Sequence, residues 1–358
     1  MSTLIIAEAG TAHAKDIKTA KMLVDAAHRS KADCVKFQWV YADEILHPNT
    51  GFVTLPTGNI PLYDCFKNLE VTPAFFQEIA DYVHSKGMLF ACSPFGKRSF
   101  TELSAVKPDI IKIASPELNH FELLSLAAAS VFPVIVSSGV SLLKDIEKAL
   151  SYFEHRLNTV SLLHCVTNYP APEEDYNVSV LKNLHSIFGV SVGTSDHSKD
   201  PVLVPALSVL NGAVIIEKHI TLDPEGTSLD DPVALTEQQF LQMSNFIRFA
   251  ETSPGEALSS LQKTYGQEKI SLVIGNGLKK LAPSERMHYL RTNRSIHYMT
   301  SLSKGHIITK NDIGVLRTEK VLTPGVSPEY LSLFTGSVLQ KDVVSGEGAV
   351  FEHIVGKK

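Results

Sequence analysis

The sequence predicts an α/β protein: a (β/α)8 TIM barrel over its first two-thirds, followed by a small C-terminal α+β module. Two observations predict the barrel. Short β-branched runs recur eight times along the chain, and stretches with the apolar spacing of amphipathic helices separate most of them. Because alternating strand and helix units force parallel pairing and right-handed crossovers, eight such units close naturally into a barrel.

The expected strands cover residues 3–8, 34–39, 88–93, 109–115, 134–137, 160–165, 190–195 and 213–219. Helical spacing is clearest over 17–32, 73–86, 142–154, 178–188, 201–210 and 236–252, and the last of these would follow the eighth strand. A doubly wound open sheet is the competing fold. It is disfavoured because no glycine-rich dinucleotide-binding turn follows the first strand.

Two stretches lie outside this alternation. Residues 40–71 are rich in proline and glycine and show no clear period, and loops of that length in a compact domain usually act as lids or binding loops. After residue 253 the alternation gives way to an irregular connector and then to short strands with turns. The predicted organisation is a barrel over residues 1–255, a linker over 256–290 and a separate module over 291–358.

The composition narrows the class of protein. With 358 residues, 44% of them hydrophobic, and a net charge of −5, the chain can build a core but not the basic surface that nucleic-acid binding requires. The cysteines lack the CxxC spacing of a zinc site and are expected to be reduced thiols. We expect neither a signal peptide nor a membrane-spanning segment. The expected protein is cytoplasmic and binds neither nucleic acid nor membranes.

Polar side chains gather at the C-terminal ends of the expected strands, which in a barrel build the active site. Residues two apart on a strand share a face, and the inward pairs are Ile6 with Glu8, Lys36 with Gln38, Ser195 with His197, and Glu217 with His219. Charged groups inside a barrel are costly unless paired or bound, so the charged strand-end residues are expected to share one polar site. They are Glu8, Lys36, Lys112 and Glu117. The alternative is a set of separate ion pairs or solvated rim residues.

His197 and His219 end the seventh and eighth expected strands, which are neighbours in a barrel. Two imidazoles aimed at one point suit a transition-metal ion such as Mn2+, Zn2+ or Fe2+, with water at the open positions. Glu8 would orient a metal-bound water. Without a metal, backbone groups or Asp196 would satisfy the imidazoles instead. The pairing of the two histidines favours the metal site.

Cations and hydroxyls follow the second to fifth expected strands. They suit a small anion that carries phosphate and carboxylate groups. They are Lys36, Lys112, Ser93, Ser115 and Ser137. The alternative is that such serines cap the following helices, and residues 137–139 fit capping well. A lysine in mid-strand is harder to explain by a structural role.

These residues lie in segments that resemble the sialic acid synthase family in order and spacing. The segments are IAEAG (6–10), VKFQ (35–38), CSPF (92–95), IKIASPE (111–117), VSSG (136–139), LLHCVTNYPAP (162–172), VGTSDHS (192–198) and IIEKHIT (215–221). Residues 294–354, with KGHIITKNDIGVLR (304–317), resemble that family's antifreeze-like (SAF) domain. The resemblance covers nearly the whole chain.

The resemblance implies a role for each matching residue. It makes Glu8 the carboxylate that positions the attacking water, and His197 and His219 the ligands of a divalent metal, Mn2+ first, with Mg2+ or Co2+ as alternatives. Residues that match phosphoenolpyruvate-binding positions are Lys36, Ser93, Lys112, Ser115, Ser137, Thr167 and Ser195. Residues that match positions holding the acceptor sugar are Gln38, Glu117, Tyr169, Asp230 and Arg317. The resemblance places Arg317 against the partner subunit's barrel in a domain-swapped homodimer.

The implied activity is a metal-dependent condensation of phosphoenolpyruvate with an N-acetylated amino sugar, giving a nonulosonic acid and phosphate. The acceptor, N-acetylmannosamine or a diacetamido-trideoxyhexose, stays open because residues 220–235 and 318–325 depart from the family pattern, and Asp231 is an alternative to Asp230. Two other functions are retained. They are a 3-deoxy sugar-acid synthase that uses phosphoenolpyruvate, whose known forms lack the C-terminal module, and a non-catalytic sugar-binding barrel, which needs no metal and water geometry.

Overall fold

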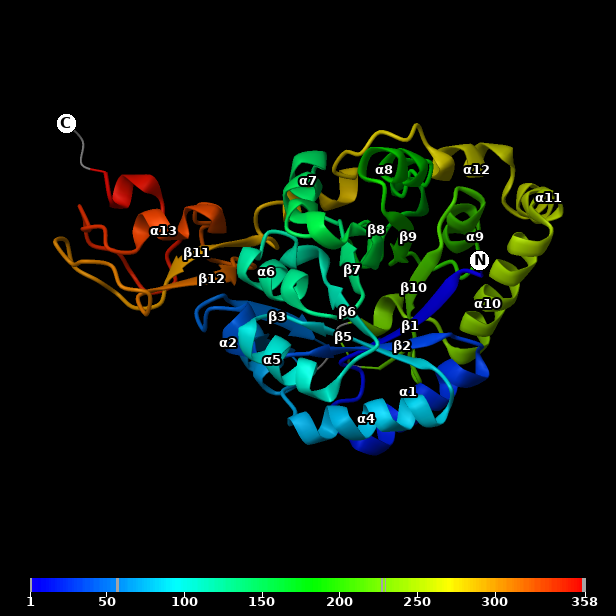
Figure 1. The fold of residues 1–358 in the computed structure, drawn as a ribbon, viewed down its shortest axis with the longest axis horizontal. Coiled ribbons are helices and arrows are strands. Elements are labelled where there is room, and N and C mark those ends of the chain that lie inside the picture. Colours follow the sequence, from blue (N-terminus) through cyan, green and yellow to red (C-terminus); the bar gives the residue numbers. More distant parts are fainter. Residues whose placement is uncertain (1, 56–57, 227, 229, 356–358) are drawn as a thin grey trace.

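The expected barrel is present, and its eight strands run parallel in the order β1–β2–β5–β6–β7–β8–β9–β10 before closing on β1 (Figure 1). The structure, a computed structural model, describes residues 2–55, 58–226, 228 and 230–355. Residues 56–57 of the expected lid, 227 and 229 of the 220–235 stretch, and residues 1 and 356–358 at the ends of the expected domains lie outside the described residues. The strands are β1 (Leu4–Gly10), β2 (Cys34–Trp39), β5 (Leu89–Pro94), β6 (Ile110–Ile113), β7 (Val134–Ser137), β8 (Val160–Cys165), β9 (Ser191–Asp196) and β10 (Ile215–His219).

A helix follows each barrel strand along the chain. These helices are α1 (Ile17–Arg29), α4 (Pro73–Ser85), α5 (Lys97–Val106), α6 (Phe121–Ala129), α7 (Leu143–Ser151), α8 (Val180–Phe188), α9 (Leu203–Leu210) and α10 (Glu237–Thr252). Six match the stretches with helical spacing. The segment of α6, FELLSLAAA, is apolar almost all round and therefore shows little periodicity. Within the described residues, no helix combines the length and the apolar character needed to cross a lipid bilayer.

Local side-chain chemistry sets the helix ends. Asp16 precedes α1, and its carboxylate accepts a hydrogen bond from the backbone N of Thr19 at 2.9 Å. Thr236 and Gln239 form a capping box at the start of α10. At the end of α8, Gly189 adopts a left-handed φ of 67°, which closes the helix without the steric cost that a side chain would bring.

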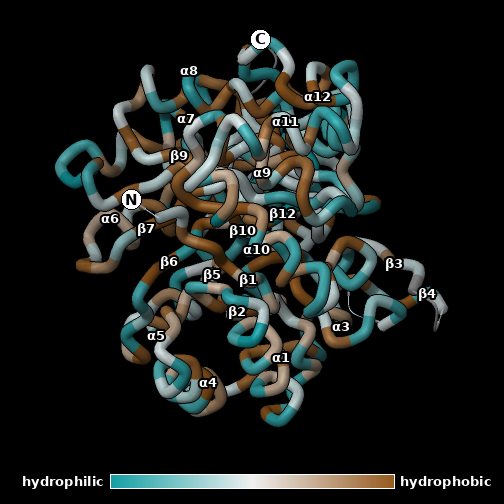
Figure 2. The backbone as a smooth tube through the Cα atoms, turned by 90° about the vertical axis from the view of Figure 1, so that its right-hand side faces the viewer, coloured by the Kyte–Doolittle hydropathy of each residue, from teal (hydrophilic) through white to brown (hydrophobic). Residues whose placement is uncertain are grey.

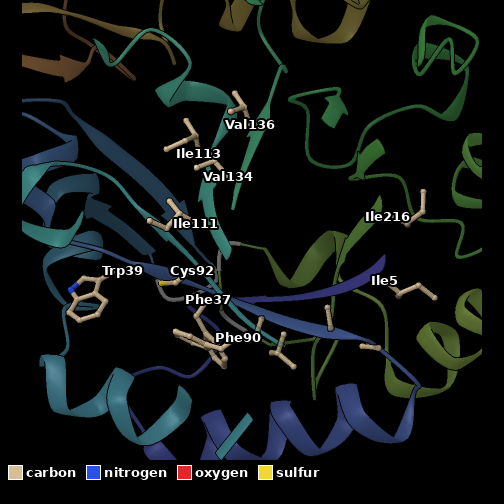
Figure 3. Close-up of a cluster of buried hydrophobic side chains, with 14 of the residues drawn as sticks. Ile5, Phe37, Trp39, Phe90, Cys92, Ile111, Ile113, Val134, Val136 and Ile216 are labelled. Carbon is tan, nitrogen blue, oxygen red and sulfur yellow. The ribbon is translucent and has the colours of Figure 1, made fainter. Parts of the chain in front are cut away.

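Two apolar layers enclose the barrel wall. Outward strand residues pack against the helices, as Figure 3 shows for Phe37, Phe90 and Trp39, and brown stretches of the strands in Figure 2 mark the same core. Inside the barrel a separate cluster, the apolar floor, consists of Ile6, Cys34, Ala91, Ile110, Ile135, Leu163 and Ile215. Ile6 lies in the floor whereas Ala7 packs toward the helices, so the alternation expected for the first strand is confirmed.

The stretch between β2 and α4 was expected to lack regular structure, and this was wrong. It contains α2 (Ala42–Ile45), β3 (Phe52–Leu55), β4 (Gly58–Pro61) and α3 (Leu62–Lys67). The strands β3 and β4 pair antiparallel, and their hairpin projects from the barrel at the right of Figure 2. Elements of four to six residues are too short to leave a visible period in the sequence.

The first half of the expected linker is helical rather than irregular. Helices α11 (Pro254–Tyr265) and α12 (Gln267–Ile274) pack beside α9, and their Leu261 and Val273 join a buried cluster with α9 residues. Pro254 lies in the first turn of α11, where its missing N–H costs nothing, so it starts a helix instead of ending one. The irregular connector therefore begins only at residue 275, and it contains the 3-10 turn η5 (Pro283–His288).

The C-terminal module is built on an antiparallel pair, β11 (Arg294–Tyr298) and β12 (Ile313–Arg317). Its own apolar core includes Ile296, Tyr298 and Phe334, the last of which belongs to α13 (Leu331–Phe334). In Figure 1 the module lies at one end of the molecule, where β12 contacts α2 of the barrel.

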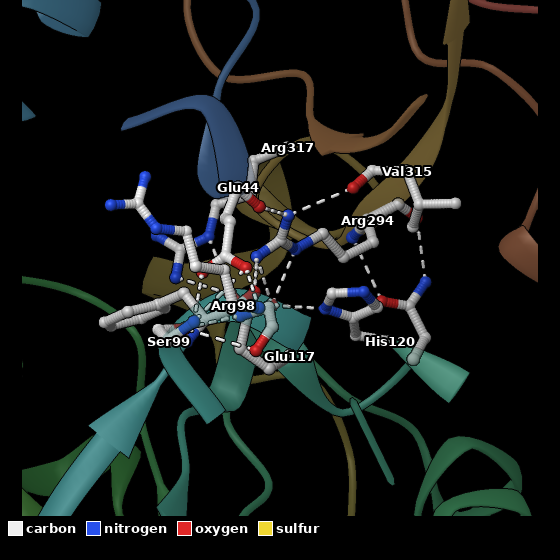
Figure 4. Close-up of polar contacts among 11 residues, drawn as sticks. Glu44, Arg98, Ser99, Glu117, His120, Arg294, Val315 and Arg317 are labelled. Atoms are coloured by element: carbon white, nitrogen blue, oxygen red, sulfur yellow. Dashed lines mark hydrogen bonds and ion pairs between the residues drawn. The ribbon is translucent and has the colours of Figure 1, made fainter. Parts of the chain in front are cut away.

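A buried ion cluster joins the module to the barrel (Figure 4). Glu117, in a 3-10 turn after β6, is fully buried and accepts hydrogen bonds from Arg294 Nε and Arg317 Nη2, both at 2.6 Å. Arg294 also donates to the carbonyl oxygen of Phe95 at 2.8 Å. Burial would raise the pKa of Glu117, but the two guanidinium groups hold it well below its ordinary value. Removing one partner would therefore leave buried charge without compensation.

Replacing Glu117 with Gln removes the charge that both guanidinium groups share. We expect the free energy of unfolding to fall by about 3–5 kcal/mol, measured by urea denaturation at neutral pH. Glu122→Gln, at an exposed position of α6, is the matched control and should change it by less than about 0.5 kcal/mol. A Glu117→Gln protein as stable as the wild type would show that the cluster does not hold the module.

Candidate active site

Two residues beyond the apolar floor, the barrel interior becomes polar. Because side chains alternate along a strand, the residue two positions after each floor residue also points inward. This inward ring contains Glu8, Lys36, Ser93, Lys112, Ser137, Cys165 and Glu217, and on β9 it contains Ser195, which lies two residues after Gly193. We call its ionised members the charged layer, and these are Glu8, Lys36, Lys112 and Glu217. None of the four is more than 4% exposed.

The charged layer is a chain of ion pairs that alternate in sign. Lys36 Nζ lies 2.9 Å from Glu8 Oε1 and 3.7 Å from Glu217 Oε2, and Lys112 Nζ lies 3.6 Å from Glu217 Oε1. The two lysines and two glutamates balance, so the layer is neutral. Among the described residues, neither Glu8 Oε2 nor Glu217 Oε2 has a hydrogen-bond partner. Buried oxygens of this kind call for a donor from a water or a substrate.

Glu217 was not among the expected site residues, although it lies at the centre of the charged layer. It also accepts a hydrogen bond from Ser195 Oγ at 2.8 Å. Burial would raise the pKa of Glu217, but the ammonium groups of Lys112 and Lys36, with the Ser195 hydroxyl, lower it to about 2. The signal was present in the sequence, because Glu217 lies two residues before His219 on the inward face.

The two lysines respond differently to their surroundings. Burial would lower the pKa of Lys36, but the carboxylates of Glu217 and Glu8 raise it above its ordinary value. Lys112 has only one carboxylate close by, so burial lowers its pKa. An anion that approaches Lys112 would favour its charged form.

His197 and His219 lie side by side, with ring centres 5.6 Å apart. Nδ1 of His197 is 2.9 Å from the carbonyl oxygen of Val166, which leaves Nε2 as the nitrogen available to a ligand. The ring of Tyr169 stacks on His197 with centres 4.2 Å apart, and it is 45% exposed, so it borders the open side of the site. Burial lowers the pKa of His219 and favours its neutral imidazole.

The histidines fit a metal that takes only part of its ligands from the protein. The described part of the chain holds no group of three or more His, Cys, Asp or Glu side chains arranged around one ion. Two imidazoles near the unpaired oxygens of Glu8 and Glu217 fit a cation with further ligands from water and substrate. Burial would lower the pKa of His197, but the Cys165 sulfur at 3.7 Å and the Val166 carbonyl raise it to about 9. A metal would have to compete with that proton.

The structure separates the two candidate aspartates. Asp230 Oδ2 lies 3.8 Å from His219 Nδ1, beside the histidine pair. The carboxylate of Asp231 instead accepts hydrogen bonds from Thr221 Oγ1 at 3.0 Å and from the backbone N of Ser228 at 2.7 Å. These bonds hold Asp231 within its own loop, so Asp230 is the aspartate that lies beside the histidine pair.

Two other expected residues contact the charged layer directly. Gln38 Nε2 donates to Glu8 Oε1 at 2.8 Å, and Lys36 Nζ donates to Ser93 Oγ at 3.4 Å. Gln38 lies two residues after Lys36 on β2, so the inward face expected for this strand is confirmed.

The remaining expected hydroxyls lie near Gly139. Ser115 Oγ accepts a hydrogen bond from Gly139 N at 3.0 Å. A Cβ atom on Gly139 would come within 2.1 Å of Thr167 Oγ1 and 2.9 Å of Ser115 Oγ, so only a glycine fits here. Ser137 Oγ and Thr167 Oγ1 are buried without a hydrogen-bond partner among the described residues.

Glu117 and Arg317, both expected to hold a sugar, bind each other, and their contact with a sugar stays a prediction. Arg317 contacts the barrel of its own chain, and the contact with a partner subunit's barrel that the resemblance implied stays a prediction. The connector before β11 is anchored to the same barrel. Asn293 Nδ2, for example, donates to the carbonyl oxygen of Val140 at 3.2 Å.

The chain matches two family models, NeuB family over residues 23–259 and SAF domain over residues 293–355. The chain belongs to the NeuB family. An N,N'-diacetyllegionaminic acid synthase of Legionella pneumophila is 31% identical to this NeuB-family chain over 363 residues, covering 99% of this chain and 95% of that protein.

Two solved structures support the assignment. The spore coat polysaccharide biosynthesis protein spsE of Bacillus subtilis superposes with a TM-score of 0.83 at 28% identity, covering 100% of this chain and 96% of that one. An N-acetylneuraminic acid (sialic acid) synthetase of Leptospira borgpetersenii, in complex with citrate, gives 0.64 at 30% identity, covering 80% and 90%. The NeuB-family chain is thus an enzyme, a synthase of the transferase class.

Glu217 links the stability of this enzyme to pH. Its folded-state pKa of about 2 lies below the ordinary value of 4.5. Its pairing therefore stabilises the fold fully above about pH 4.5, and this contribution is lost as the pH falls toward 2. We expect Glu217→Gln to be less stable than the wild type at pH 7, and the difference to shrink at pH 3, as measured by urea unfolding. Glu154→Gln, at an exposed position, should follow the wild type at both pH values. A difference that stays constant with pH would contradict the pairing.

Proposed function

We propose that this enzyme condenses phosphoenolpyruvate with an N-acetylated amino sugar to give a nonulosonic acid and inorganic phosphate. The observation that carries the proposal is the charged layer, with unpaired carboxylate oxygens and hydroxyls, beside the pair of histidines. Relatives named as legionaminic acid, pseudaminic acid and N-acetylneuraminate-9-phosphate synthases support the reaction class.

Phosphoenolpyruvate carries a phosphate and a carboxylate, and both need cationic or hydroxyl partners. Lys36 and Lys112 supply the cations in a buried setting, where charge-assisted hydrogen bonds are strong. Ser137 and Thr167 supply donors that have no partner within the described residues. Ser195 and Ser93 hold the charged layer in place. The set expected from the sequence therefore divides into anion-binding groups and groups that orient them.

Glu8 is assigned to the water that enters the reaction. Its Oε1 is held by Lys36 and Gln38, which leaves Oε2 to accept a hydrogen bond from water. C3 of phosphoenolpyruvate forms a bond to the aldehyde carbon of the sugar, and the aldehyde oxygen takes a proton. Water adds at C2 and gives one proton to Glu8, which passes it to the former aldehyde oxygen. The C2–O bond to phosphate then breaks while the proton of the new C2 hydroxyl moves to the phosphate, which leaves a C2 carbonyl. Lys36 and Lys112 stabilise the charge that moves onto the phosphate.

His197 and His219 would hold a divalent cation, Mn2+ first, with Mg2+ or Co2+ as alternatives. Such a cation supplies Lewis-acid polarisation of the sugar aldehyde. Tyr169, Asp230 and Gln38 surround this position and are assigned to the acceptor. The acceptor is N-acetylmannosamine or a diacetamido-trideoxyhexose.

The cellular setting and the assembly stay predictions. All four cysteines are free thiols, which supports a reducing compartment such as the cytoplasm. A homodimer that exchanges C-terminal domains would require Arg317 to leave Glu117 of its own chain for the partner subunit's Glu117. Size-exclusion chromatography with light scattering, over a range of concentrations, tests the assembly.

Phosphate release from phosphoenolpyruvate tests the function. The acceptors are N-acetylmannosamine, diacetamido-trideoxyhexoses and a phosphorylated aldose, each with Mn2+ present. Release with an amino sugar alone supports the proposal. Release with the phosphorylated aldose alone identifies a 3-deoxy sugar-acid synthase, and no release with any acceptor favours a binding protein.

Replacing Glu8 with Gln keeps the shape of the side chain but removes its ability to take a proton. We expect kcat to fall by about 100- to 10,000-fold while the affinity for phosphoenolpyruvate changes little, because Lys36 keeps its contact with Glu217. Steady-state kinetics and calorimetry measure the two quantities. Glu154→Gln is the matched control. A Glu8→Gln enzyme with near-normal kcat would remove Glu8 from the reaction.

Replacing His197 with Ala removes one of the two imidazoles assigned to the cation. We expect Mn2+ binding, followed by calorimetry, to be lost, and the wild-type protein to lose activity in EDTA and regain it with Mn2+. His28→Ala, at an exposed position of α1, should bind Mn2+ like the wild type. Equal Mn2+ affinity of the His197→Ala protein would rule out the assigned site.

A further inference from the structure

The connector between the barrel and the SAF domain runs across the open end of its own barrel. In Figure 1 the yellow segment after α12 turns back past α8 and α7 before it reaches β11. It is fastened along the way by Asn177 Nδ2, which donates to the carbonyl oxygen of Leu278 at 2.9 Å, and by Lys279 Nζ, which donates to that of Ser138 at 2.9 Å. Its path therefore crosses the loops that follow β8 and β7.

Glu285 is the most deeply buried polar group of this connector, at 1% exposure. Its Oε2 accepts hydrogen bonds from the backbone N of Thr167 at 2.9 Å and of Val140 at 3.0 Å, and its Oε1 accepts one from Ala282 N at 3.1 Å. One carboxylate thus joins the connector to two separate barrel loops. A bond from a carboxylate to a backbone N–H is stronger than one between neutral groups.

The loops after β7 and β8 are tightly constrained where Glu285 binds them. Val140 has a φ of +43°, a left-handed conformation that is strained for a β-branched residue. Glu285 holds its N–H, and Asn293, also of the connector, holds its carbonyl oxygen at 3.2 Å. The preceding residue, Gly139, packs so closely that a Cβ would meet Thr167 Oγ1 at 2.1 Å. Because the backbone at Gly139 packs directly against the Thr167 side chain, a small shift of either loop would change the position of the Thr167 hydroxyl.

The unpaired hydroxyls of the site lie in these loops or directly before them. Ser137 Oγ and Thr167 Oγ1 are both buried without a partner among the described residues; Ser137 is the last residue of β7, and Thr167 lies two residues after β8. The backbone N–H groups of Thr167 and Val140 are used by Glu285, so side-chain hydroxyls remain as the donors that face an anion.

We propose that Glu285 is a positioning residue for the phosphate end of the phosphoenolpyruvate site. It acts by fixing Thr167 and the loop around Gly139 in the arrangement that directs their hydroxyls at the anion. The connector is then a part of the substrate site as well as a link between domains. The inference rests on the proposed function and deepens it.

The test compares Glu285→Ala, Glu285→Gln and the control Glu268→Ala, an exposed residue of α12. Alanine leaves all three backbone N–H groups without their acceptor, and glutamine keeps the shape but loses the charge. We expect the KM for phosphoenolpyruvate to rise about tenfold or more in the alanine variant and less in the glutamine variant. The KM for the amino sugar should rise less, because Gln38 and Asp230 lie outside the two loops that Glu285 contacts, and of the residues assigned to the sugar that lie near the histidines only Tyr169 shares a loop with Thr167.

Binding of phosphoenolpyruvate without sugar, measured by calorimetry, should weaken by the same factor as the KM rises. A merely structural role would lower the melting temperature and the active fraction and leave both KM values unchanged, and that result would overturn the inference. If the Glu285→Ala protein does not fold, the KM values of the Glu285→Gln protein for phosphoenolpyruvate and for the amino sugar test the inference in the same way. A wild-type protein that fails to bind phosphoenolpyruvate would overturn the proposed function and this inference together. Binding by the wild type with equal binding by both variants would overturn the inference alone.

Discussion

The main physical constraint on this structure is the burial of the four ionised side chains of the charged layer inside the barrel. Taking a lysine ammonium or a glutamate carboxylate out of water costs several kcal/mol per ion. The charged layer tolerates this because its members alternate in sign, each within about 4 Å of an opposite charge. The apolar floor beneath it excludes water from one side. An anion that enters from the open side meets ammonium groups that are already desolvated and held in place.

The regular part of the fold was predictable because its periods are strong. The β-branched runs matched the barrel strands closely, and alternation on β1 and β2 identified the inward residues Glu8 and Lys36. Short elements were not predictable, because four residues such as those of β3 carry no usable period. The stretch after residue 253 was expected to be irregular, although its Pro254 fits the first turn of a helix, as in α11.

The same distinction between strong local patterns and long-range contacts applies to the residues of the site. Residues fixed by position on a strand, such as His197 and His219, could be placed together from spacing alone. Contacts between distant segments could not, since nothing local marks them. Arg294 lies 177 residues from Glu117, and its sequence context is that of an ordinary strand. Glu217 is an intermediate case. Its inward position on the strand could be predicted from the sequence, but its ion pairs with Lys36 and Lys112 depend on the closure of the barrel.

The order of the chain makes the contacts of the loops after β7 and β8 with Glu285 among the last to form. Glu285 follows Thr167 by 118 residues and Val140 by 145, and it lies after all the barrel strands. A nascent chain that has emerged as far as α10 can therefore close its barrel before this carboxylate has left the ribosome. Until then two loops lack the acceptor for their amide groups. A product terminated after the barrel would therefore lack the carboxylate that joins these two loops.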